Sequence, residues 1–251
     1  MNRRVRDYVD VVRRLEALPR RHWRTRQAGR VWGYPWFVAE RVVSPGAPTV
    51  LLSGGMHGEE PAGVEGVLQW LERGDWMRWP INWFVFPCIN PYGWERNQRT
   101  NAQRRDINRR FRGRDDTPEA RLVGRLLKHR QFLFSIEFHE DVDASGYYLY
   151  EARRTPPFIG EKILRAVRRV VHINPDPVID GNRATGHGLI RRDGDPAAFR
   201  RRRRWPMAIH LFLNHTGHIL GSETPVTVPL QQRADAHMNA LRTALREELG
   251  R

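Results

Sequence analysis

The chain has little of three things that direct proteins toward particular classes: cysteine, long apolar runs and lysine. Cys88 is the only cysteine among 251 residues, which excludes an intramolecular disulfide and leaves His, Asp and Glu to build any metal site. No apolar run reaches the roughly 18 residues that a membrane-spanning helix needs. No apolar stretch follows the basic amino terminus either, so we expect a cytoplasmic protein without a membrane partner.

Because lysine is scarce, nearly all of the positive charge comes from arginine, and the formal net charge is +15. Such a charge favours nucleic acid, anionic lipid or acidic substrates as partners, but an arginine bias set by genome base composition requires no polyanion. The sequence contains neither an aromatic-basic RNA motif nor a helix-turn-helix signal, and we expect no nucleic-acid partner. The densest cluster, 200–204, should lie in a solvated loop, because adjacent guanidinium groups cannot all be paired in an interior.

An apolar content of 40% indicates a folded chain, which we expect to form a single hydrolase domain over residues 1–251. Strand and helix patterns alternate along it. Strands are expected in a hairpin at 30–43 and at 48–53, 81–90, 132–140, 147–151 and 218–223; helices at 2–18, 61–74, 118–129, 158–171 and 229–249; a turn at 91–93 and a long loop at 175–205. This alternation predicts an α/β fold, with a mixed, mainly parallel, twisted central sheet flanked by helices on both faces.

Three of the predicted strands end in charged side chains: the first in His57 and Glu60, a later one in His139, and the last in Glu223. Ligand sites of such sheets lie at the carboxyl ends of the strands, so these side chains should converge. Two histidines and a glutamate are a common ligand set of catalytic zinc, with a fourth position left for water. A separate carboxylate is needed to move the proton of that water. The sequence therefore predicts one zinc ion held by His57, Glu60 and His139, with Glu223 as general base.

Each of these signals is weak when taken alone. A His-x-x-Glu spacing occurs by chance in a chain of this length, and His139 by itself is more typical of a partly buried, hydrogen-bonded structural histidine than of a metal ligand. The position of His57 and Glu60, after Gly54 and before Pro61 at a favourable first helical position, distinguishes them from a chance pair.

Four stretches in order resemble motifs of the zinc carboxypeptidases of the carboxypeptidase A type. They are GGMHGEEPAG (54–63), which resembles the first zinc-ligand motif; NPYGWERNQRTNAQRRDINRRF (90–111), which resembles an Asn-Pro-Asp-Gly turn followed by Arg-x-Asn and Asp-Leu-Asn-Arg-Asn-Phe; IEFHED (136–141), which resembles the third-ligand strand; and GSETP (221–225), which resembles the strand of the catalytic glutamate. The resemblance implies the same metal ligands and base. It also implies that Arg99 polarises the scissile carbonyl, and that Asn108 and Arg109 hold a free carboxylate of the substrate.

The resemblance favours a compact bacterial metallocarboxypeptidase that cleaves an amide bond next to a free carboxylate in a small peptide. The alternative is an N-acyl amino acid deacylase of the related succinylglutamate desuccinylase/aspartoacylase group. In either case the net charge suggests an acidic substrate. A basic nucleic-acid-binding protein and a metal-binding protein without catalysis remain as further alternatives.

One departure from the family pattern concerns the tyrosine that caps the substrate shortly before the catalytic glutamate in many members. No tyrosine occurs after Tyr150. Trp205, His210, His215 or His218 could take its place, and nothing in the sequence selects among them.

Overall fold

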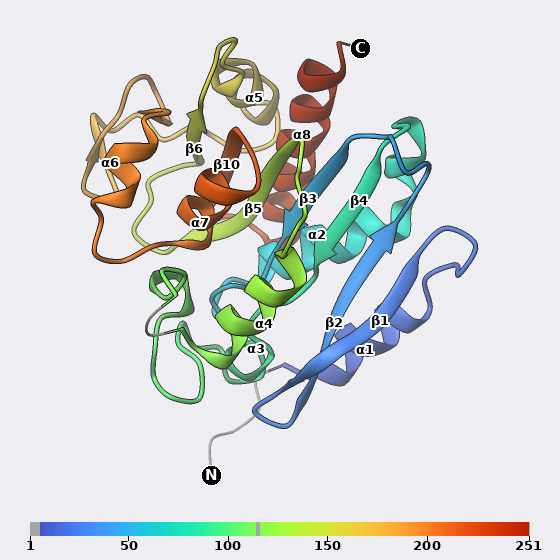
Figure 1. Cartoon of the computed structure of the whole chain (residues 1–251). Coiled ribbons are helices and arrows are strands. Elements are labelled where there is room, and N and C mark those ends of the chain that lie inside the picture. The colour runs from blue at the N-terminus through green and yellow to red at the C-terminus, as the bar shows by residue number, and fades with distance from the viewer. Residues whose placement is uncertain (1–5, 114–115, 251) are drawn as a thin grey trace.

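A mixed eight-stranded sheet forms the centre of the computed structural model, which describes residues 6–113 and 116–250 (Figure 1). The strands follow the order β1 (Arg24–Val31), β2 (Tyr34–Arg41), β4 (Asn82–Phe86), β3 (Thr49–Ser53), β5 (Phe134–Asp141), β10 (His218–Pro225), β6 (Tyr148–Arg153) and β9 (Leu189–Asp193). The four central strands β4, β3, β5 and β10 are parallel. A separate small hairpin joins β7 (Val178–Ile179) to β8 (Asn182–Arg183).

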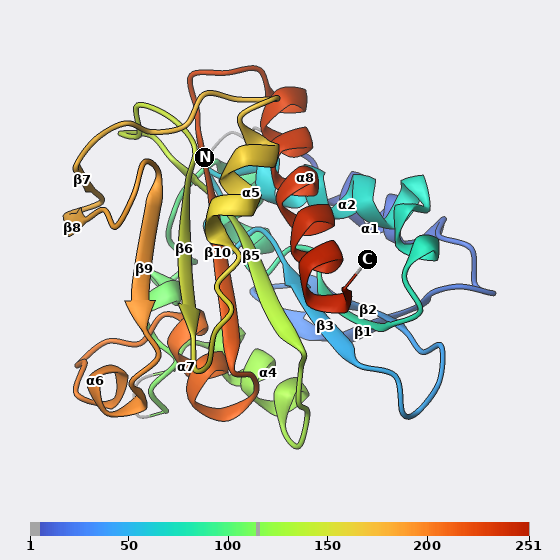
Figure 2. The same ribbon diagram turned by 90° about the horizontal axis from the view of Figure 1, so that it is seen from above.

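Helices cover both faces of the sheet (Figure 2). On one face lie α1 (Tyr8–Glu16), α2 (Pro61–Arg73), α5 (Gly160–Val167) and α8 (Leu230–Leu249); on the other lie α4 (Pro118–Leu127), α6 (Pro196–Arg200) and α7 (Met207–Asn214). Short α3 (Pro91–Arg96) follows β4, and 3₁₀ turns occur at Asp75–Arg78 and Ile107–Arg109.

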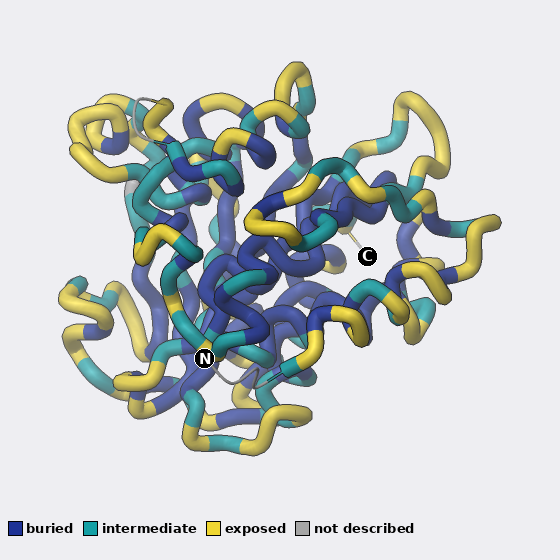
Figure 3. Tube along the Cα trace, turned by 90° about the horizontal axis from the view of Figure 1, so that it is seen from below, coloured by how far each residue is buried: buried dark blue, intermediate teal, exposed yellow. Residues whose placement is uncertain are grey.

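The central strands are apolar throughout because both of their faces are covered. In β3, Val50 and Leu52 belong to the core beneath α2 and α8, whereas Leu51 belongs to the core on the α4 and α7 face. Figure 3 shows the consequence, with buried residues concentrated in the middle of the molecule and exposed residues on the outer loops. The predicted fold class is therefore confirmed.

Two local predictions were wrong, one helix was missed, and the bounds of the hairpin were only partly right. Residues 91–93 begin helix α3 rather than form a simple turn, because Asn90 caps the helix by accepting a hydrogen bond from the Gly93 amide at 2.9 Å. The stretch 175–205 contains β7, β8, β9 and α6 rather than one long loop, and α7 was not predicted at all. The hairpin expected at 30–43 spans 24–41. The first helix begins at Tyr8; residues 2–5 of its predicted span lie outside the described part.

The missed strand β9 has a physical cause. Strand β9 contains only two apolar residues, Leu189 and Ile190, and it forms by pairing in parallel with β6. Such an edge strand depends on its neighbour more than on its own sequence pattern.

Candidate functional site

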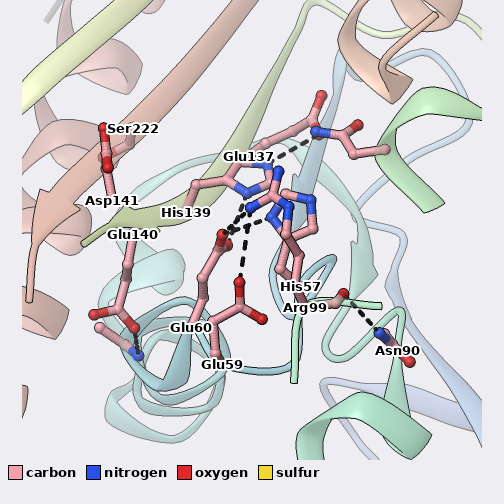
Figure 4. Close-up of polar contacts among 12 residues, drawn as sticks. His57, Glu59, Glu60, Asn90, Arg99, Glu137, His139, Glu140, Asp141 and Ser222 are labelled. Atoms are coloured by element: carbon pink, nitrogen blue, oxygen red, sulfur yellow. Dashed lines mark hydrogen bonds and ion pairs between the residues drawn. The ribbon is translucent and has the colours of Figure 1, made fainter. Parts of the chain in front are cut away.

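His57, Glu60 and His139 meet at the carboxyl end of the central strands, and all three are buried. The Glu60 carboxylate lies between the two rings: its Oε1 is 2.5 Å from Nδ1 of His57, and its Oε2 is 2.9 Å from Nδ1 of His139 (Figure 4). One potential ligand atom from each residue lies within 4.8 Å of the others. The structure thus brings together the three residues that the sequence predicted as metal ligands.

Glycine makes the connection from β3 to α2 possible. Gly55 has a φ of +64°, a region that residues with a side chain rarely adopt. At Gly54, an added Cβ would lie 2.4 Å from the carbonyl oxygen of Gly63 in α2. The helix therefore packs directly against the strand end and fixes where its first residues lie.

Glu60 is the N-cap residue of α2, yet its side chain makes no capping hydrogen bond to the helix. An amide group at the start of α2 bonds to another element instead: the amide of Ala62 donates to Oε2 of Glu140 in β5 at 2.6 Å. Glu140 also pairs with Arg233 of α8. The hydrogen bond from Ala62 to Glu140 connects the start of α2 to the end of β5, and so fixes Glu60 relative to His139. The Glu60 carboxylate, which does not cap the helix, is available to contact the two histidines.

A second carboxylate lies beside the outer nitrogen of each histidine. Nε2 of His57 is 3.2 Å from Oδ1 of Asp106, and Nε2 of His139 is 3.5 Å from Oε2 of Glu137. Such carboxylates orient metal-binding histidines and fix which ring nitrogen carries the proton. The sequence analysis assigned no role to either residue. Glu137 could have been found from strand alternation, because it precedes His139 by two residues and therefore faces the same side of β5.

The electrostatics of this cluster favour a bound cation. Burial acts against the charged form of His57, but the carboxylates of Glu60 and Asp106 raise its pKa. Burial likewise opposes ionisation of Glu60, and the two histidines nevertheless lower its pKa. A carboxylate oxygen lies beside each nitrogen of both imidazole rings, and this arrangement stabilises positive charge at the cluster. Two imidazole nitrogens and a carboxylate oxygen are the donor set of catalytic zinc, so the residues present fit that metal.

Glu223 lies next to the cluster, on the neighbouring strand. It pairs in register with His139 on one side and with Tyr148 on the other, so the three side chains share one face of the sheet. Burial raises the pKa of Glu223 to about 8, with a further contribution from Glu60, although His139 acts in the opposite direction. Glu223 is therefore poised to take up and release a proton near neutral pH.

Arg99 reaches the rim of the cluster from the loop after α3. Its Nη1 lies 3.8 Å from Oε1 of Glu60 and 3.7 Å from Oε1 of Glu59, and its Nε donates to Oδ2 of Asp106 at 3.2 Å. The backbone of Arg99 is held by Asn90, whose side-chain amide donates to the Arg99 carbonyl (Figure 4).

Asn108 and Arg109 form the adjoining wall. Oδ1 of Asn108 accepts a hydrogen bond from the Met207 amide at 2.9 Å, which leaves the amide NH₂ group of Asn108 as a donor. Nη1 of Arg109 donates to the Asn108 carbonyl at 2.9 Å. Both residues line the same cavity as the histidine cluster, so all seven residues that the sequence analysis placed in the site are brought together.

The cavity has a volume of about 640 Å³ and is open to solvent beside the cluster. Its described lining includes two tyrosines of β6, Tyr148 and Tyr150. Tyr148 donates to Asp141 at 2.9 Å, and Tyr150 donates to Asp180 at 2.6 Å.

None of the four residues suggested in place of the capping tyrosine is among the described lining residues, which run instead through Arg202, Arg204, Pro206, Ala208 and Ile209. His218, for example, is buried and bonded to Glu248. The phenol groups at this site therefore come from β6, the strand that pairs with β10, and not from the residues before Glu223 where the sequence led us to look.

Comparisons with known proteins agree with this geometry. Residues 46–170 match the family model of the succinylglutamate desuccinylase/aspartoacylase catalytic domain. No curated protein matches the chain in sequence. Among the described helices, none is long and apolar enough to cross a bilayer.

Solved structures share the fold. A candidate metallopeptidase from Shewanella amazonensis superposes with a TM-score of 0.79 at 24% identity, over 96% of this chain and 91% of that one. A metallo-carboxypeptidase from Burkholderia cenocepacia gives a TM-score of 0.66 at 16% identity, covering 97% and 68% of the two chains. Carboxypeptidase A from Helicoverpa armigera gives 0.67 at 13% identity, covering 96% and 72%.

Proposed function

Because the chain belongs to the carboxypeptidase-like, desuccinylase-related family, we propose that it is a zinc-dependent hydrolase that cleaves an amide bond next to a free carboxylate of a small substrate. The observation that carries this proposal is the convergence of His57, Glu60 and His139 with Glu223 in one open cavity. The donor set indicates a metal, and the unligated carboxylate beside it supplies the proton acceptor that hydrolysis requires.

His57, Glu60 and His139 would hold the metal. When bound there, zinc polarises a carbonyl and lowers the pKa of water toward about 7. Glu223 accepts the proton of the attacking water and passes it to the nitrogen of the leaving amine. Burial raises the pKa of Glu223, and a carboxylate shielded from water in this way is a stronger base than an exposed glutamate, which suits it to both steps.

Arg99 donates hydrogen bonds to the oxygen that becomes negative as the carbonyl is attacked. Its guanidinium already lies against Glu60 and Asp106, and a fixed donor of this kind stabilises the transition state more than the substrate. Arg109, together with the free amide of Asn108, binds the substrate carboxylate, for which a planar guanidinium offers two parallel donors.

Two kinds of substrate fit this description, a peptide with a free carboxyl terminus and an N-acyl amino acid. The match to the desuccinylase/aspartoacylase model over residues 46–170 favours the second, whereas the carboxypeptidase-like folds in the comparison favour the first. The chemistry at the metal is the same in both. The difference lies in the group on the acyl side of the scissile bond.

A substrate panel tests the proposal and separates the two kinds. Zinc-loaded protein is incubated with N-acetyl, N-succinyl and N-dipeptidyl derivatives of the same amino acids, and the released amine is measured. We expect turnover of at least one series, and we expect Glu223→Gln to lower kcat by roughly 10²–10⁴-fold while retaining its zinc. Turnover that survives in Glu223→Gln would eliminate Glu223 as the base, and the absence of turnover with every series would reject the proposed function.

A further inference from the structure

Two histidines of α7 face each other outside the cavity. His210 lies within the helix, and His215 is its C-cap residue. The sequence suggested both as replacements for the capping tyrosine, but neither is among the described residues that line the cavity, whereas their neighbours Ala208 and Ile209 are. The Nε2 atoms of the two rings are 3.3 Å apart, and the ring centroids are 5.1 Å apart. The proposed hydrolysis uses neither ring.

The ring of His215 is held by the segment that follows α4. Its Nδ1 is 3.0 Å from the carbonyl oxygen of Arg130, and the His215 carbonyl accepts a hydrogen bond from the Phe132 amide at 2.8 Å. His215 is only 8% exposed. Because a carbonyl oxygen can only accept, Nδ1 of His215 carries a proton. In the neutral ring, Nε2 therefore presents its lone pair to His210.

The ring of His210 is half-buried beside Phe111, with the ring centroids 6.1 Å apart. Burial and the neighbouring His215 lower the pKa of His210 to about 4, and the backbone of Phe111 acts in the opposite direction. A backbone group that raises the pKa of a histidine is a carbonyl that accepts from the ring. The neutral ring of His210 can therefore give its one proton to Phe111, which leaves the lone pairs of both Nε2 atoms facing each other.

The spacing of these two atoms matches a pair of metal ligands. A distance of 3.3 Å is longer than the roughly 2.7–3.2 Å of a normal N–H···O hydrogen bond. Two imidazole nitrogens bound to tetrahedral zinc at about 2.0–2.1 Å lie about 3.3–3.4 Å from each other. Metal-binding histidines also donate their other N–H to a backbone carbonyl or a carboxylate, as the contact of His215 with Arg130 does.

We propose that His210 and His215 bind a second zinc ion through their Nε2 atoms. In the described part of the chain, the only group of three or more metal-ligating side chains is His57, Glu60 and His139, so water completes the coordination at the second site. Two neutral rings attract a cation less than two rings with a carboxylate do, and the second site therefore fills after the first. This inference does not depend on the proposed hydrolysis.

A metal at this site would stabilise the carboxyl end of α7. Both ligands belong to this helix and its cap, and the folded chain holds their rings at the distance that zinc requires. The unfolded chain does not hold them in this way, so binding favours the folded state by mass action. We therefore expect excess zinc to raise the unfolding temperature.

The test starts from protein that already contains one equivalent of zinc. Calorimetry measures the binding of further zinc, and thermal unfolding is followed with and without excess zinc. His210→Gln removes one proposed ligand, and His187→Gln is the matched control, because His187 is exposed and lies outside the pair. Nitrogen NMR of the histidine rings in wild-type protein reports their protons and their metal contacts without any substitution.

Wild-type protein and His187→Gln should bind a second equivalent of zinc. His210→Gln should bind it more than about tenfold more weakly, since even the loss of an outer contact of a ligand costs roughly 10–100-fold. Excess zinc should raise the unfolding temperature of wild-type protein by at least about 2 °C and leave that of His210→Gln unchanged. In the NMR spectrum, the second equivalent should shift Nε2 of two rings while Nδ1 of both stays protonated.

Equal affinity of wild-type protein and His210→Gln for the second equivalent would overturn the site, as would the absence of a second binding event. If His210→Gln does not fold, the wild-type NMR experiment decides. Two ring Nε2 resonances that respond together to the second equivalent support the site, and ring nitrogens that do not respond reject it.

Discussion

The two ends of the cavity are built in opposite ways. At the metal end, His57, Glu60 and His139 are 3%, 2% and 6% exposed, and each is held by contacts from a strand end or a helix start. The adjoining wall includes Arg99, whose side chain is 43% exposed, and Arg202 and Arg204, which line the cavity and are exposed as well.

This difference separates chemistry from selectivity. Ligand positions are fixed by the sheet register and by the close packing of α2, so a change there disturbs the metal site directly. A guanidinium on the wall can be replaced at little cost to folding, because substitutions of exposed residues usually change stability by less than about 0.5 kcal/mol. On the proposed function, the metal end would determine whether hydrolysis occurs, and the wall would determine which substrate is used.

The largest effect on zinc affinity is expected at Glu60, and its neighbour Glu59 provides the matched comparison. Glu60→Ala removes a carboxylate that lies between both histidines, and we expect zinc affinity to fall by more than roughly 100-fold, since even the loss of an outer carboxylate costs 10–100-fold. Glu59→Ala removes only a contact to Arg99 at 3.7 Å and should retain the metal. Zinc content after dialysis against a weak chelator measures both, and a Glu59→Ala protein without zinc would show that the ligands have been misassigned.

A smaller effect should follow from Arg99, the wall residue nearest the metal. Arg99→Ala removes the proposed oxyanion donor, and kcat should fall by roughly 10²–10³-fold with zinc content unchanged. Steady-state kinetics on the best substrate of the panel provides the measurement. A rise in KM alone would instead mean that Arg99 binds the ground state of the substrate.

Asp106 connects the two ends, because it contacts both Nε2 of His57 and the guanidinium of Arg99. Asp106→Asn keeps the shape but not the charge, and zinc affinity should decrease by about 10–100-fold. Competition with a chromophoric chelator measures it. Unchanged affinity would indicate that the contact seen here does not orient His57.

An effect on folding stability rather than on metal or turnover is expected behind the metal end, at His237. Its ring stacks on Phe138 at a centroid distance of 4.6 Å, and its Nδ1 is 2.8 Å from Oγ of Ser222. Burial lowers its pKa to about 3 from 6.5, so the folded protein keeps this ring neutral at a pH where the unfolded chain is protonated. Stability should therefore be unaffected by His237 above pH about 6.5 and should be lost below it, by up to about 1.4 kcal/mol per pH unit.

Denaturant unfolding of His237→Gln at several pH values tests the direction of this pH dependence of stability. The variant should lose less stability than wild-type protein as the pH falls from about 6.5 to 4. Parallel pH curves for the two proteins would show that the ring is not held neutral in the folded state.

The sequence predicted the metal end of the cavity from local signals, but it did not predict the wall in the same way. Strand ends, the Gly-Gly turn and the proline at the start of α2 are local signals, and they led to His57, Glu60, His139 and Glu223 because parallel strands bring their carboxyl ends to one edge. The wall residues Arg99, Asn108 and Arg109 had no such local signal and were found only through the motif resemblance. Strand β9 exists through its pairing with β6, and the segment that follows the arginines at 201–204 is held by a hydrogen bond from the Phe111 amide to the Trp205 carbonyl.

The cavity tyrosines were not predicted for a similar reason. Tyr148 and Tyr150 precede the catalytic strand by about seventy residues in sequence, yet they lie beside it because β6 pairs with β10 in antiparallel register. Register between strands so distant in the chain cannot be read from either strand alone.

The central claim is that the cluster of His57, Glu60 and His139 binds the metal that hydrolysis requires. Its most direct test is to titrate zinc into chelator-stripped protein while following both bound metal and released amine. The account predicts that activity rises in proportion to bound zinc and reaches its maximum at one equivalent per chain, and that Glu60→Ala shows neither response. Full activity in the stripped protein, or stoichiometric zinc binding by Glu60→Ala, would contradict it.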